Sequence, residues 1–113
     1  MMSSTYVRRF NLKGSLSDAE VGKFWHFLLS EFMPAIEKIK GVHAIKAYSG
    51  AGALRADIRL TLAMDDAGVY ENLLRAPAVH SMLGTFYGAI DLTTSTQTFI
   101  REVTPDLLKA LSS

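Results

Sequence analysis

The sequence contains no cysteine, which excludes disulfide bonds, thiolate catalysis and cysteine-bound metal ions. It also has no strong excess of either charge, because 12 lysines and arginines stand against 11 aspartates and glutamates. A formal net charge of +1 disfavours both a nucleic-acid-binding surface and a polybasic membrane-binding face. Because 49% of the residues are hydrophobic and only 20% are charged, the composition is that of a folded chain.

Long hydrophobic runs are absent as well. The most apolar stretch, residues 24–39, is interrupted by charged residues and by Pro34, so it cannot span a bilayer. The start of the chain has no apolar run behind a basic head, so we see no signal peptide. We therefore expect a cytoplasmic protein with no membrane or nucleic-acid partner. A length of 113 residues predicts a single domain over residues 1–113.

The clearest local signal is the start of the first helix. Ser17 and Glu20 have the spacing of a capping box, in which each side chain bonds the backbone amide of the other residue. Apolar residues then recur at helical spacing from Val21 to Ile39. The sequence therefore predicts one long amphipathic helix.

Two features of this helix predict departures from a simple amphipathic helix. Pro34 has no N–H and its ring clashes with the carbonyl four residues earlier, so we expect an irregularity near Ser30 and Glu31. The apolar arc is also wider than one sheet face needs. A tail helix over residues 105–111 is the first candidate to cover the surplus, and a partner subunit is the second.

A second helix is predicted over residues 67–87, interrupted at Pro77. Four shorter segments have the composition of β-strands. In the third of them, Ile58, Leu60, Leu62 and Met64 alternate with the residues of the opposite face, so this apolar set should pack beneath the helices. The four strands are expected at residues 6–12, 42–48, 56–64 and 92–103.

The order of these elements is β-α-β-β-α-β. It predicts an α+β, ferredoxin-like fold: a four-stranded antiparallel sheet with helices on one face, followed by a short C-terminal helix. This fold supports many unrelated functions, and no motif in the chain identifies a reaction.

Residues 66–80, DAGVYENLLRAPAVH, follow the third strand directly. This segment resembles the helix of dimeric α+β barrel proteins, and most closely that of the stress-responsive A/B barrel branch, whose members often carry a Pro-Ala-His step. In this chain Val79 stands in the place of that histidine and His80 comes next, which turns the side chain by about 100° on a helix.

The resemblance implies a homodimer in which two sheets pair face to face and the helix-free face of each sheet lines a pocket. It implies either a small-molecule-binding, stress-associated protein or a cofactor-independent cyclase or monooxygenase acting on an aromatic or polyketide-like substrate. Whether the protein is an enzyme stays open at this point, and we expect no bound cofactor. An amino-acid-sensing regulatory domain is disfavoured, because such domains usually accompany an enzyme domain.

Arg59 is the first candidate for ligand binding, because strand alternation places it opposite Ile58 and Leu60. Arginines inside a pocket would select a carboxylate, phenolate or enolate, whereas on an exposed sheet they would pair with Asp57 and Glu102. The further ligand-binding candidates are Arg9, Asn11, His43 and Tyr48.

His80 is the candidate general acid or base, by its position in the family resemblance. Such a residue would move a proton while Arg59 held an anionic oxygen. The three histidines form no His-x-His or helical pair, so we expect no metal site.

Overall fold

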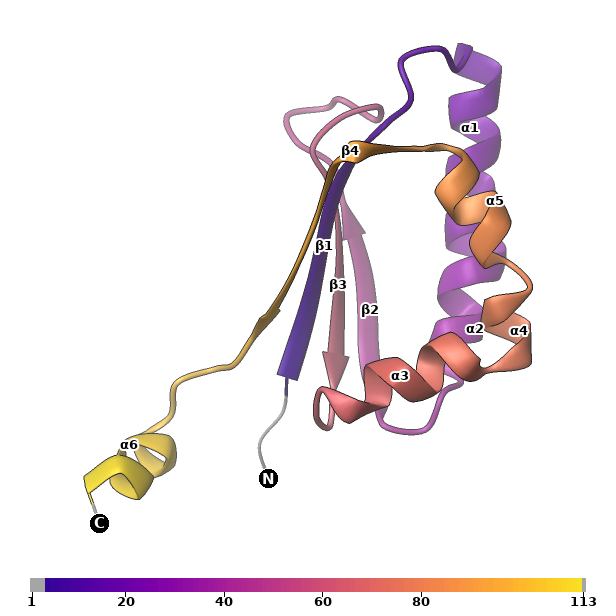
Figure 1. The fold of residues 1–113 in the computed structure, drawn as a ribbon. Coiled ribbons are helices and arrows are strands. Elements are labelled where there is room, and N and C mark those ends of the chain that lie inside the picture. The colour runs from indigo at the N-terminus through magenta and orange to yellow at the C-terminus, as the bar shows by residue number, and fades with distance from the viewer. Residues whose placement is uncertain (1–3, 113) are drawn as a thin grey trace.

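The computed structural model of the protein describes residues 4–112 and has two layers, with a sheet on one side and helices α1 to α5 on the other (Figure 1). The sheet is four-stranded and antiparallel, in the order β2-β3-β1-β4. The α+β, ferredoxin-like architecture is therefore confirmed. The strands are β1 (Ser4–Leu12), β2 (Val42–Tyr48), β3 (Ile58–Met64) and β4 (Ile90–Ile100).

Helix α1 (Asp18–Phe27) begins at the predicted capping box. The Ser17 hydroxyl accepts from the Glu20 amide at 3.1 Å, and the Ser17 amide donates to the Glu20 carboxylate at 2.9 Å. Two otherwise unpaired amides are thereby satisfied. The helix buries Val21 and Phe24 against the sheet.

The irregularity expected from Pro34 is a π-helical turn, η1 (Leu28–Phe32), which joins α1 to α2 (Met33–Glu37). The wider turn lies at the position where the proline ring would meet the carbonyl of Ser30. From this turn the Ser30 hydroxyl donates to the carbonyl of His26 in the last turn of α1.

The second helical region is divided more than the sequence predicts. It consists of α3 (Gly68–Arg75), α4 (Pro77–His80) and α5 (Leu83–Gly88). The first break follows from Pro77, because the residue before a proline avoids the α-helical conformation, and Ala76 is extended. The break between α4 and α5 was not predicted.

Strand β3 confirms the predicted alternation. Leu60 is 6% exposed, whereas Arg59 on the opposite face is exposed. We call this opposite surface, which carries Val7, Arg9, Tyr48, Arg59 and Thr61, the helix-free face. The four residues of β3 that pack beneath the helices are Ile58, Leu60, Leu62 and Met64.

The prediction that the tail helix covers α1 was wrong. Helix α6 (Pro105–Ser112) lies beyond the end of the sheet, on the side away from α1 (Figure 1). Strand β4 carries the chain to that end, and residues 101–104 continue outward. Leu29 on the first helical region therefore remains 56% exposed. No helix within residues 4–112 is long and apolar enough to cross a membrane.

Candidate functional site

A charged residue lies on the helix-covered face of the sheet. Arg8 stands in β1 between Tyr6 and Phe10, which are 5% and 1% exposed. Because alternate residues of a strand share a face, the Arg8 side chain also points toward the helices. Charged side chains are seldom placed among buried neighbours unless a specific partner holds them.

The partners of Arg8 are hydroxyl groups. Its Nε donates to the Ser95 hydroxyl at 2.9 Å, and one terminal nitrogen donates to Tyr87 at 3.2 Å and to Tyr6 at 3.3 Å. The guanidinium carbon lies 5.1 Å from the centre of the Tyr87 ring, within cation–π distance. No carboxylate among residues 4–112 forms an ion pair with Arg8.

The hydroxyl network continues from Arg8 to helix α3. The Tyr6 hydroxyl donates to the side-chain oxygen of Gln97 at 3.0 Å and lies 3.3 Å from the Tyr70 hydroxyl. The rings of Tyr6 and Tyr70 are 4.5 Å apart, and Phe99 packs against both. Strands β1 and β4 and helices α3 and α5 therefore all contribute to one polar cluster.

Burial changes the proton affinities in this cluster. Burial alone would lower the pKa of Arg8, but its hydrogen bond to Tyr6 and its interactions with Tyr6 and Tyr87 outweigh that effect and raise the pKa. Burial, followed by the hydrogen bond with Tyr6, raises the pKa of Tyr70 well above its ordinary value. At neutral pH, Arg8 is therefore charged and Tyr70 is a neutral hydrogen-bonding group.

A cavity of about 40 Å³ adjoins Arg8. Its volume admits water but is below the roughly 300–1,000 Å³ of typical ligand pockets. Five of its lining residues are partly exposed and mark its side nearest to solvent: Arg8, Tyr70, Leu74, Leu83 and Tyr87. The walls are otherwise apolar and include Phe32, Ile36, Leu60, Leu73 and Phe86.

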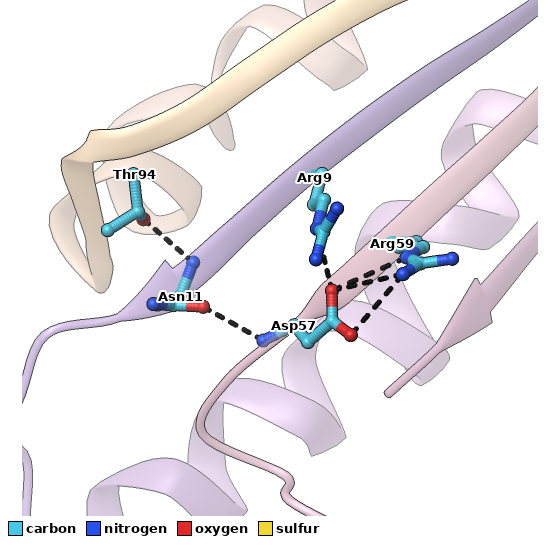
Figure 2. Close-up of polar contacts among 5 residues, drawn as sticks. All are labelled: Arg9, Asn11, Asp57, Arg59 and Thr94. Atoms are coloured by element: carbon cyan, nitrogen blue, oxygen red, sulfur yellow. Dashed lines mark hydrogen bonds and ion pairs between the residues drawn. The ribbon is translucent and has the colours of Figure 1, made fainter. Parts of the chain in front are cut away.

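Three of the predicted ligand-binding residues come together on the helix-free face. Arg9 and Arg59 both contact the Asp57 carboxylate, Arg9 at 2.7 Å and Arg59 at 3.3 Å (Figure 2). Tyr48 is the cross-strand partner of Arg59 in β2 and is 50% exposed.

Asn11 ties the end of β1 to two other segments. Its backbone amide donates to the Thr94 hydroxyl at 2.9 Å, and its side-chain oxygen accepts from the Asp57 amide at 2.8 Å (Figure 2). The structure therefore gives Asn11 a positioning role for Asp57.

The two histidine candidates lie apart from the arginine pair. His43 is exposed near the opposite end of β2, where its Nε2 contacts Asp65. His80 is exposed on α4, in the helix layer (Figure 1). Within residues 4–112, no three side chains of His, Asp or Glu converge as metal ligands.

Sequence reasoning missed the cluster of Arg8 with Tyr6, Tyr70 and Tyr87. The sequence did contain one indication of this cluster. Arg8 occupies every second position of β1 together with Tyr6, Phe10 and Leu12, and therefore shares their face. No local sequence pattern indicated that the tyrosines of α3 and α5 would contact Arg8 or Tyr6.

No protein-family profile matches the sequence, and no curated protein sequence matches it either. Solved structures do match its fold. A conserved protein from Methanosarcina mazei Go1 has a TM-score of 0.70 at 15% identity, over 91% of this chain and 95% of that chain. A dimeric protein of unknown function and ferredoxin-like fold from Bacteroides fragilis NCTC 9343 has a TM-score of 0.68 at 13% identity, over 88% and 96%.

SnoaB, a cofactor-independent oxygenase from Streptomyces nogalater, has a TM-score of 0.68 at 14% identity, over 93% of this chain and 99% of that chain. Similarity at such low identity concerns the fold alone. These neighbours confirm the ferredoxin-like fold.

Proposed function

We propose that the protein binds a small molecule in the pocket between the sheet and the helices, where Arg8 holds an anionic or phenolic oxygen of the ligand. The observation that carries this proposal is the environment of Arg8. Its half-buried side chain lies beside apolar cavity walls and, within residues 4–112, its hydrogen bonds go to hydroxyl groups. A partly desolvated guanidinium without a carboxylate partner attracts an anionic group, because charge-assisted hydrogen bonds are stronger than those to hydroxyls.

The walls of the pocket favour a flat, largely apolar ligand. Phe32 and Phe86 stack at 4.7 Å between ring centres, and Leu60 and Leu73 are buried beside the cavity. A few polar anchors in an apolar enclosure are the usual composition of a small-molecule site. We therefore expect small phenols and aromatic enols to bind better than sugars or nucleotides, and their binding requires the partly exposed side chains around the cavity to move apart.

The second candidate function is a cofactor-independent cyclase or monooxygenase. Arg8 and the tyrosine hydroxyls support it, because hydrogen-bond donors fixed around an oxygen stabilise a phenolate or enolate. The lining supplies no carboxylate or imidazole base among the described residues, and Tyr70 is held neutral by its raised pKa. His80, the predicted acid or base, is exposed on α4 and does not line the cavity. Binding without turnover is therefore the function that we place first.

A thermal-shift and calorimetric screen of phenols, naphthols and aromatic enols tests the proposal. We expect Arg8→Gln to weaken the best ligand roughly tenfold to a hundredfold, the effect of losing a hydrogen bond to a charged group. Lys13→Gln, which changes an exposed positive charge, is the matched control. Unchanged affinity in the Arg8 variant would contradict the proposed site, and consumption of the ligand over time would favour the enzyme.

A further inference from the structure

The helix-free face carries a second cluster of charge, on the opposite side of the sheet from Arg8. Arg9 and Arg59 are direct cross-strand partners in β1 and β3. Tyr48 is the next residue along the same row in β2, and Thr96 completes the row in β4. Like charges placed opposite one another destabilise a sheet, so this pair needs an anion between its members.

One carboxylate serves both arginines. Asp57 lies 2.7 Å from the Nε of Arg9, but its contacts with Arg59 measure 3.3 and 3.4 Å (Figure 2). The side chains of Arg9 and Arg59 are 57% and 48% exposed. The cluster therefore keeps a net positive charge, and the bonds of Arg59 to Asp57 are long enough to be exchanged for better ones.

The backbone of Asp57 is held in an unusual conformation to place this carboxylate. Its φ is +51°, in the left-handed region, where residues other than glycine carry strain. The Asn11 side chain accepts from its amide at 2.8 Å, and the Gly50 amide donates to its carbonyl at 3.1 Å. A Cβ on Gly50 would lie only 2.5 Å from the Asp57 carboxylate, so glycine is required for this approach.

Arg59 and Asp57 line a hollow of about 520 Å³. Val7, Tyr48 and Thr61 are also part of its lining. This volume falls within the usual range of small-molecule sites, roughly 300–1,000 Å³. An aromatic side chain next to an arginine offers a flat apolar surface beside a bidentate oxyanion site.

We propose that Arg9 and Arg59 form a binding site for the carboxylate of a small aromatic acid. The Asp57 carboxylate occupies the position of the ligand's carboxylate in the free protein and is displaced when the ligand binds. The ring of the ligand then lies over Val7 and against Tyr48. This site is independent of the Arg8 pocket, because the sheet separates the two.

Benzoate is the probe for this site, and benzyl alcohol is its uncharged control. We expect Arg9→Gln and Arg59→Gln each to weaken benzoate roughly tenfold or more, as loss of a charge-assisted hydrogen bond does. Lys38→Gln, at an exposed charge in the helix layer on the other side of the sheet, should change affinity by less than about twofold. Benzyl alcohol should not bind measurably.

Asp57→Asn is the sharpest variant. Asparagine tolerates positive φ and keeps the shape of the side chain, so the fold should be retained, which circular dichroism checks. If Asp57 competes with the ligand, this variant must bind benzoate several-fold more tightly than the wild type. A merely structural role for Asp57 would leave the affinity unchanged or reduce it.

The Arg8→Gln variant separates this site from the pocket of the proposed function. We expect it to bind benzoate like the wild type, and among the arginine side-chain Nε–H signals we expect only those of Arg9 and Arg59 to shift. The proposal would be overturned if benzoate showed no saturable binding at concentrations up to roughly 10 mM. The proposal would also be overturned if Arg8→Gln abolished benzoate binding while Arg59→Gln left it intact.

Discussion

Arg8 and Arg9 are consecutive residues with the same side chain, yet they lie on opposite faces of one sheet. Arg8 points toward the helices and bonds tyrosine hydroxyls, whereas Arg9 points away and pairs with Asp57. The alternation of side chains along a strand is the whole cause of the difference. At this scale, chemistry is decided by position within the strand and not by residue type.

The raised pKa of Tyr70 makes a prediction about alkaline stability. A free tyrosine ionises near pH 10, and the folded state holds Tyr70 neutral beyond that point. The stabilisation is therefore complete below about pH 10 and is lost as pH rises through the pKa of the folded state. We expect Tyr70→Phe to reduce the decline in the free energy of unfolding between about pH 9 and 11, as measured by urea titration. Tyr48→Phe, at an exposed tyrosine, should retain the wild-type decline.

The lowered pKa of Glu20 leads to a prediction about stability in acid. The Ser17 backbone amide, and then its hydroxyl, lower the pKa of Glu20 below its ordinary 4.5. The contribution of the carboxylate to stability is therefore present above about pH 4.5 and is lost as pH falls through the pKa of the folded state. We expect the wild type to have a higher melting temperature than Glu20→Gln at pH 7. The difference in melting temperature should shrink at about pH 3. A difference that stays constant with pH would contradict the capping role of the charged form, and Glu31→Gln is the exposed control.

At the scale of the element, strand β3 gives a direct test of the two faces. Leu60 is 6% exposed beneath the helices, and Thr61 faces the other way. We expect Leu60→Ala to lower the free energy of unfolding by about 2–5 kcal/mol, and Thr61→Ala by much less. Chemical denaturation of both variants measures this. Comparable losses would show that the faces are reversed.

The helices show which structural features can be predicted from residues close together in the sequence. The capping box fixed the start of α1, and Pro34 marked the region of the π-helical turn, because both effects act over three or four residues. The break between α4 and α5 follows no such rule. It turns the chain between Val79 and Phe86, which are both buried against the same core.

At the scale of the whole molecule, one sheet face and the tail helix lie outside the shared core. The helix-free face exposes Ile100, and α6 exposes Leu108 and Leu111. The radius of gyration is 15.7 Å, above the roughly 13 Å of a compact domain of this length, because the tail extends outward. Apolar surface in this arrangement suits a second copy of the chain.

We therefore predict a homodimer. Sedimentation at micromolar concentration should give twice the chain mass of 12.4 kDa. Ile100→Asp, at an exposed apolar residue of the helix-free face outside the hollow beside Arg59, should shift the protein toward the monomer, because it places an unpaired charge in the interface. Lys38→Asp, on the exposed surface of the helix layer, should not. A stable monomer of the wild type would contradict the pairing of two sheets.

The sequence by itself determined the order of the elements, the start of α1 and the two faces of β3. These follow from periodicities and caps that act between residues at most a few positions apart. It also indicated Arg59 and Arg9 as neighbours of an anionic group, through the alternation of their strands.

Only the tertiary structure decided that Arg8 meets Tyr87 and that Tyr6 meets Tyr70 and Gln97, because these partners lie 64 to 91 residues apart in the chain. Such contacts depend on strand order, register and the turns between α3, α4 and α5. The direction of α6 likewise depends on where β4 ends. No local pattern encodes these, because they result from how all the elements pack together.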